Sequence, residues 1–120
     1  MKPAPPLTRI VGKAILPVGD LTEAMAFYEG LGFEVETYDS GYAWVRHGGG
    51  EILHLQVAPG LRPDANHASC YLHVQDADAW HAAWREFGVT VGQLTDRPWG
   101  MREFSLTDPS GNLIRIGHNL

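Results

Sequence analysis

The 120-residue sequence has one cysteine, few basic residues and no long apolar run, and each shortage excludes a class of protein. Cys70 has no partner for an intrachain disulfide, which fits a reducing cytoplasm. Nine basic residues against fourteen acidic ones give a formal charge of −5. This argues against nucleic acid as a partner, because phosphate binding needs a basic face. No apolar stretch approaches the length needed to span a membrane.

Other signatures are missing as well. No glycine-rich loop leads from a strand into a helix, which leaves nucleotide binding without support. Cys70 lies in an apolar strand context and is interpreted as a buried structural thiol, not a nucleophile. Residues 1–6 contain three prolines and no hydrophobic region, so they predict an extended arm and not a signal peptide. The composition, 44% hydrophobic and 19% charged, is ordinary for one soluble globular domain over residues 1–120.

An internal repeat organises what is present. In both halves of the chain an aspartate and a glycine stand at the same separation around an apolar-periodic segment. The pattern predicts two helices, over residues 21–31 and 77–87. Trp80 and Trp84 fall on the apolar stripe of the second helix, so they are predicted to belong to the core.

Strand-like segments surround each predicted helix. They cover residues 10–18, 34–38, 42–47 and 51–57 in the first half, and residues 68–74, 90–94, 101–107 and 113–117 in the second. Gly48–Gly50 and Asp108–Gly111 have the composition of tight turns between such strands. The order β-α-β-β-β, taken twice, predicts an α+β fold with modules at about residues 8–58 and 67–118.

Several motifs carry a family resemblance. The segments WGMREF (99–104) and DPSGN (108–112) resemble the C-terminal signature of the bleomycin resistance proteins. These belong to the glyoxalase/bleomycin resistance/dioxygenase, or vicinal oxygen chelate, superfamily. The likeness extends to residues 18–21 and 27–33 and so covers nearly the whole chain. It implies that the two βαβββ modules form a curved mixed sheet with a concave cavity and with the helices outside.

The resemblance also allows a test for metal binding. In metal-dependent relatives, the ligands come from the first and last strands of each module. The corresponding positions here hold Lys13, His54, Ser69 and Arg115, of which only His54 is a good ligand. This departure implies no metal, no other cofactor and no glyoxalase-like activity. One alternative stays open: a register shift along the same strand face would bring His67 to the position of Ser69.

Aromatic residues offer the remaining recognition chemistry. Tyr42 and Trp44 share one strand face, and Trp99 enters the matching strand of the second half. By the resemblance, Tyr42 falls where the bleomycin binders carry an aromatic residue, and Trp99 matches their drug-stacking tryptophan. Stacked rings gain roughly 0.5–1.5 kcal/mol per pair beyond area burial. The predicted ligand-binding residues, with no catalytic residue among them, are Tyr42, Trp44, His54, Trp99, Met101, Arg102 and Glu103.

The combined hypothesis is a non-enzymatic cytoplasmic protein that binds and sequesters a bulky cationic aromatic antibiotic of the bleomycin class, which confers resistance. The similar proteins form their grooves between two subunits, so a homodimer is expected, with Pro3-Ala4-Pro5-Pro6 as an exchanged arm. Two alternatives remain: a metal-dependent glyoxalase- or dioxygenase-type enzyme of the same superfamily, and a binder of another small aromatic ligand. Any planar ligand could use Tyr42 and Trp99, so the sequence does not separate the last alternative from drug binding.

Overall fold

The computed structural model describes residues 1–4, 6 and 8–120, and the predicted order β-α-β-β-β occurs twice in it. The first module consists of β1 (Ala14–Val18), α1 (Leu21–Gly30), β2 (Glu34–Asp39), β3 (Tyr42–His47) and β4 (Gly50–Val57). A short 3-10 helix, η1 (Pro63–Ala65), leads to the second module: β5 (Ser69–His73), α2 (Ala77–Glu86), β6 (Thr95–Asp96), β7 (Met101–Thr107) and β8 (Leu113–Asn119). The predicted α+β fold of paired βαβββ modules is confirmed.

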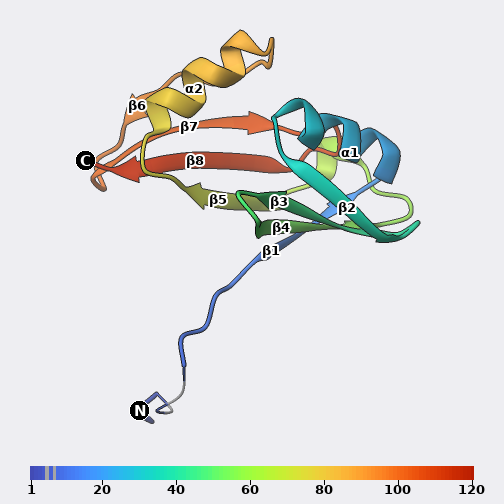
Figure 1. Ribbon diagram of the computed structural model, residues 1–120, viewed down its shortest axis with the longest axis horizontal. Helices are drawn as coiled ribbons and strands as arrows, with labels where there is room; N and C mark the ends of the chain where they lie inside the picture. Colours follow the sequence, from blue (N-terminus) through green and yellow to red (C-terminus); the bar gives the residue numbers. More distant parts are fainter. Residues whose placement is uncertain (5, 7) are drawn as a thin grey trace.

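The strands form two four-stranded sheets, with the orders β1-β4-β3-β2 and β5-β8-β7-β6. In each sheet one pair is parallel, β1 with β4 and β5 with β8, and the other pairs are antiparallel. The sheets touch where β1 and β5 meet, without forming a shared hydrogen-bonded ladder. Figure 1 shows α1 and α2 on the same side of the two sheets. The opposite faces of the sheets carry no helix.

Helix boundaries follow from capping. Asp20 accepts a hydrogen bond from the backbone N–H of Glu23 at 2.9 Å, and Asp76 accepts one from that of Ala79 at 3.1 Å. Each carboxylate thereby satisfies one of the free N–H groups of the first turn. Beyond each helix end stands a glycine with positive φ, which terminates the helix without the penalty of a Cβ. Both predicted helices are confirmed.

The core lies between the helices and the sheet faces that they cover. Trp84 on α2 is 1% exposed, and its indole N–H donates to the carbonyl of Leu31 at 2.9 Å, which joins α2 to the end of α1. Trp80 is partly buried and packs edge-on against Trp84 at the margin of the core. A cavity of about 220 Å³ beside these rings is lined mostly by apolar side chains. Both tryptophans therefore serve packing, as their helical spacing predicts.

The turn between β7 and β8 links the two modules. The buried carboxylate of Asp108 accepts hydrogen bonds from the hydroxyl of Tyr28 on α1 at 2.7 Å and from the backbone N–H groups of Ser110 and Asn112. The side-chain amide of Asn112 donates to the carbonyl of Pro17 on β1 at 2.8 Å. Burial, together with the Asp108 charge, raises the pKa of Tyr28, so its hydroxyl stays a donor. The turn is thus a junction between modules as well as a chain reversal.

Two strand predictions are wrong in their bounds. The first strand, predicted over residues 10–18, begins only at Ala14, where its parallel pairing with Leu53 of β4 begins. Residues 90–94 do not form a strand, and β6 follows them at Thr95–Asp96. At Gly92 the N–H still donates to the Ser105 carbonyl of β7, but the carbonyl accepts from the ring of His81 and not from a strand.

Residues 8–13, which precede β1, run away from the body of the chain (Figure 1). Ile10 is 92% exposed and Val11 is 60% exposed, so two large apolar side chains of this arm have no cover from their own chain. Pro5, which belongs to the predicted exchanged arm, lies outside the described residues. In the described part of the chain no helix is long and apolar enough to cross a membrane.

Candidate functional site

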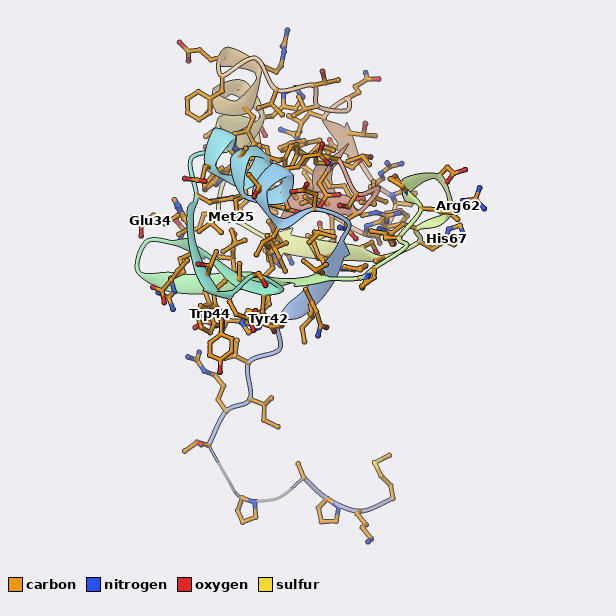
Figure 2. All side chains as sticks on the ribbon, turned by 90° about the vertical axis from the view of Figure 1, so that its right-hand side faces the viewer. Met25, Glu34, Tyr42, Trp44, Arg62 and His67 are labelled. Carbon is orange, nitrogen blue, oxygen red and sulfur yellow. The ribbon has the colours of Figure 1, made fainter. Side chains whose placement is uncertain are left out.

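The free face of the first sheet carries Tyr42 and Trp44. They alternate along β3 with the buried residues Ala43 and Val45, which face α1. Figure 2 shows both aromatic side chains on the side of the sheet away from α1, where the N-terminal arm departs. Their rings meet edge to face, with centroids 6.3 Å apart. The strand period therefore brings the two predicted ligand-binding aromatics together on an uncovered surface.

An open depression of about 590 Å³ adjoins these two rings. Tyr38 contributes a third ring, 5.9 Å from Trp44, and Arg46 lies over the other side of the Trp44 indole at 5.6 Å. The remaining lining residues are Asp39, Gly41, Gln56 and Val57. The volume falls in the range of small-molecule sites, roughly 300–1,000 Å³, but the depression is a floor without an opposite wall.

His54 on β4 holds Tyr42 in place. Its Nδ1 lies 2.6 Å from the Tyr42 hydroxyl, and its Nε2 lies 2.7 Å from Oε1 of Glu51. A carboxylate only accepts, so Nε2 carries a proton and donates a hydrogen bond to Glu51, while Nδ1 pairs with the Tyr42 hydroxyl. The hydrogen bond from His54, together with the electrostatic attraction of His54 and then of Arg46, lowers the pKa of Glu51. Glu51, His54 and Tyr42 form a chain of hydrogen bonds that fixes the orientation of the phenol.

The residues at the metal-ligand positions of related enzymes do not fit a divalent cation. Both ring nitrogens of His54 are engaged, and its neighbour on β1 is the apolar Ile15. In the second sheet the equivalent pair is Tyr71 beside Arg115, whose guanidinium repels a cation. His67, the alternative ligand, lies on the loop before β5, and Figure 2 shows it far from Tyr42.

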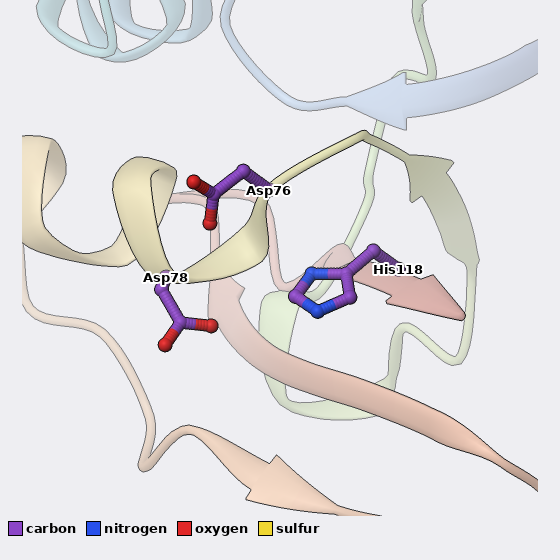
Figure 3. Close-up of side chains that lie close together, drawn as sticks. All are labelled: Asp76, Asp78 and His118. Carbon is purple, nitrogen blue, oxygen red and sulfur yellow. The ribbon is translucent and has the colours of Figure 1, made fainter. Parts of the chain in front are cut away.

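Another cluster of potential metal ligands, Asp76, Asp78 and His118, lies at the start of α2 (Figure 3). Its donor atoms already have partners. Asp76 caps α2, Asp78 lies 3.4 Å from the guanidinium of Arg102, and Nδ1 of His118 accepts the N–H of Ala77 at 2.8 Å. The cluster is explained by helix capping and ion pairing.

The free face of the second sheet carries Met101, Glu103 and Ser105 of β7. Glu103 is 3% exposed, and its Oε2 accepts the hydroxyl hydrogen of Tyr71 at 2.9 Å. Nε of Arg97 lies 3.4 Å from the other carboxylate oxygen. Burial and the bond to Glu103 raise the pKa of Tyr71 to about 12, so the phenol remains a donor at neutral pH.

Trp99 lies in the turn that joins β6 to β7. Its side chain is 61% exposed, and the Arg97 guanidinium lies 5.7 Å from the ring centroid, within cation–π range. Gly100 adopts a φ of 82° in this turn, and its carbonyl accepts the N–H of Leu120. The turn therefore lies against the C-terminus and presents an indole to the outside.

Arg102 is among the predicted ligand-binding residues, but it points the other way from Met101 and Glu103. Its guanidinium forms a two-pronged ion pair with Asp96, at 2.6 and 3.1 Å, and reaches Asp78 on α2. These carboxylates raise the pKa of Arg102. A role for Arg102 in ligand binding stays a prediction, and its position on the helix side of β7 gives that role no support.

The predicted residues form two groups that lie far apart. Tyr42 follows the turn between β2 and β3, whereas Trp99 lies next to the C-terminus. Figure 1 shows that turn and the C-terminus at opposite ends of the molecule. One planar ligand cannot stack on both rings of the same chain. A single groove that uses both requires two copies.

Four side chains contact the predicted ligand-binding residues or lie beside them but were not themselves predicted to bind ligand. Tyr71, Arg97 and Arg115 carry a signal, because strand alternation places Tyr71 and Arg115 on the free face and Arg97 precedes Trp99 by two residues. Glu51 carries none. It stands three residues from His54, a spacing that puts two side chains on opposite faces of a regular strand. A register shift in the β3–β4 pairing at Val45/Arg46 accompanies its reach to the same side.

Comparison with known proteins gives a consistent result. Residues 9–116 match the model of the family described as "Glyoxalase/Bleomycin resistance protein/Dioxygenase superfamily". The bleomycin resistance protein of Klebsiella pneumoniae is 30% identical over 112 residues, covering 87% of this chain and 88% of that protein. That of Geobacillus stearothermophilus is 30% identical over 119 residues, covering 82% and 89%.

Solved structures show the same similarity. A crystal structure of a bleomycin-binding protein in complex with bleomycin superposes with a TM-score of 0.84 at 28% identity, covering 93% of this chain and all of that one. The bleomycin-binding protein of Streptomyces verticillus, crystallised with copper(II)-bleomycin, gives a TM-score of 0.78 at 26% identity, covering 92% and 96%.

Proposed function

This chain belongs to the Glyoxalase/Bleomycin resistance protein/Dioxygenase superfamily, and we propose that it binds and sequesters a bulky cationic aromatic antibiotic of the bleomycin class. Binding alone protects the target, because an abundant binder with slow ligand dissociation lowers the free antibiotic concentration by mass action. No bond in the antibiotic is broken. The lone thiol fits a cytoplasmic location for this role.

The observation that carries the proposal is a set of accessible aromatic rings, two half-buried on the free face of the first sheet and one exposed in the β6–β7 turn. Tyr42 and Trp44 line a depression of small-molecule size, and Trp99 is 61% exposed. Large exposed aromatics are costly in water and gain from stacking on a planar heteroaromatic ligand. The bond from Tyr42 to His54 supports the same role, because a ring held in place loses little conformational entropy on binding.

The complete groove is proposed to form in a homodimer. Tyr42 of one copy and Trp99 of the other would provide its two aromatic walls, since one chain separates them. The arm supports this arrangement, because Ile10 and Val11 are exposed and would be buried by packing on a second copy.

The same positions argue against a metal-dependent enzyme. His54 already has two partners and lies opposite the apolar Ile15, two residues on from Lys13, while the cationic Arg115 lies opposite Tyr71, two residues on from Ser69. Side chains at these positions would oppose a divalent cation where the related enzymes hold one.

Titration calorimetry with metal-free bleomycin tests the proposal. We expect saturable binding with two ligands per dimer, accompanied by quenching of tryptophan fluorescence from Trp99. Binding should weaken as salt rises, because an acidic protein attracts a cationic ligand. Absence of heat and of quenching at tens of micromolar bleomycin would reject the assignment to this class of antibiotic.

A further inference from the structure

A second, smaller pocket lies on the free face of the second sheet. Its volume is about 230 Å³, and its lining is mainly polar, with Arg97, Glu103, Ser105 and Arg115 as the principal side chains. It is separate from the depression beside Tyr42, which belongs to the first sheet.

The carboxylate in this pocket already has partners on both oxygens. Glu103 receives the Tyr71 hydroxyl on one oxygen and faces Arg97 on the other. Gly117 of β8 lies between these residues, and a Cβ at this position would collide with the Tyr71 hydroxyl. The sheet therefore leaves a gap through which Tyr71 reaches across β8 to Glu103. With both oxygens engaged and only 3% of the residue exposed, Glu103 has little to offer a cationic ligand.

What remains in the pocket are hydrogen-bond donors. Arg115 is exposed, and within residues 1–4, 6 and 8–120 no carboxylate lies within 4.0 Å of its guanidinium. Ser105 is paired with Arg115 across the β7–β8 ladder, so its hydroxyl faces the same side. The pocket contains two guanidinium groups, those of Arg97 and Arg115, and one carboxylate, that of Glu103. The local charge is thus positive, although the whole chain carries −5.

We propose that this pocket binds an oxyanion, a carboxylate, sulfate or phosphate group, between Arg97 and Arg115 with Ser105 as an additional donor. Planar guanidinium groups match the geometry of such anions and bind them through paired, charge-assisted hydrogen bonds. The pocket is large enough, since a volume of about 230 Å³ exceeds the roughly 30 Å³ occupied by one water molecule several times over.

The site goes beyond antibiotic sequestration, because a free anion is sufficient to occupy it. It also predicts which charge a substituent of the bound antibiotic can carry near this pocket. The Arg97 guanidinium lies 5.7 Å from the Trp99 ring centroid, and its Nε lies 3.4 Å from Glu103, so the exposed indole and the pocket share this arginine. An acidic substituent there is favoured over a basic one by the sign of the local charge.

Side-chain NMR on ¹⁵N-labelled protein tests the site without any antibiotic. Sodium phosphate, sulfate and acetate are titrated separately, with sodium chloride holding the ionic strength constant. We expect saturable shifts of the Arg97 and Arg115 Nε–H signals with at least one anion, and the three affinities identify which oxyanion the pocket takes. Arg115→Gln should raise the Kd about tenfold or more, because a charge-assisted pair is lost. Arg115→Lys keeps the positive charge but loses the paired hydrogen bonds of the guanidinium. Its Kd should therefore lie between those of the unmodified protein and Arg115→Gln.

Arg85→Gln is the matched control, since Arg85 is an exposed arginine at the end of α2 and away from the pocket. Its Kd should equal that of the unmodified protein. Shifts that fail to saturate, or equal losses in Arg85→Gln and Arg115→Gln with both variants folded by circular dichroism, would overturn the proposal. Because no antibiotic is used, such a failure is distinct from a failure of bleomycin binding.

Discussion

The proposed groove between subunits makes a strong prediction about Trp99. The exposed part of this residue is 61%, which for an indole side chain of up to about 250 Å² is roughly 150 Å². A ring stacked on one face covers about half of that, and burial at about 25 cal/mol per Å² gives about 1.9 kcal/mol. Stacking adds roughly 0.5–1.5 kcal/mol, of which the lower half is taken here. Trp99→Ala should therefore weaken bleomycin binding by about 2.5 kcal/mol, on the order of a hundredfold in Kd.

A mixing experiment then locates the second ring. Tyr42→Ala and Trp99→Ala proteins are each expected to bind weakly as homodimers. When the two are unfolded together and refolded, half of the dimers should be mixed. Each mixed dimer has one groove with both rings intact and one with both rings missing, because Tyr42 and Trp99 of a groove come from different copies. Roughly one groove in four should then bind with the unmodified affinity.

Calorimetry on the mixture measures that fraction directly, and Trp80→Ala is the control. Trp80 packs at the margin of the core, so its removal should lower the free energy of unfolding and leave the groove affinity largely unchanged. A mixture without any high-affinity sites, made from variants that are folded and dimeric, would refute the groove between subunits. Equal losses of affinity in Trp80→Ala and Trp99→Ala would show that the groove lies elsewhere.

Other predictions concern stability, assembly, metal content and thiol reactivity. Tyr28→Phe should lower the free energy of unfolding in urea by about 1.5–3 kcal/mol, because the buried Asp108 carboxylate loses a donor; an unchanged midpoint would contradict this. Deletion of residues 1–11 should weaken the dimer in light scattering, whereas a monomer before deletion would show that the arm has no such role. Protein purified without added ions should hold no stoichiometric divalent metal by mass spectrometry, and a metal lost on His54→Ala would instead favour the enzyme alternative. Burial raises the pKa of Cys70 to about 11 from 9.0, so at pH 8 iodoacetamide should react with the folded protein on the order of a hundredfold more slowly than with the unfolded chain.

The sequence by itself determined the order of the elements and the faces of most strands. Helix ends follow from local chemistry, since Asp20 caps its own first turn and Gly32 adopts positive φ just beyond the helix. The two-residue period of a strand predicted that Tyr42 and Trp44 share one face of β3. The structure has this arrangement because the intervening Ala43 and Val45 are buried under α1. Such features depend on neighbours within a few residues, so they can be predicted without a structure.

Contacts between distant segments were decided only by the tertiary structure. The chain of bonds from Glu51 to Tyr42 could not be predicted, because it depends on a register shift in the β3–β4 pairing. The hydrogen bond that Glu103 accepts comes from Tyr71 on another strand, 32 residues away, whose side chain crosses β8 at Gly117. The wide separation of Tyr42 from Trp99 was likewise decided by the tertiary structure. Strand order and sheet pairing fix which side chains meet, and both are set by the packing of the whole chain and not by the spacing along it.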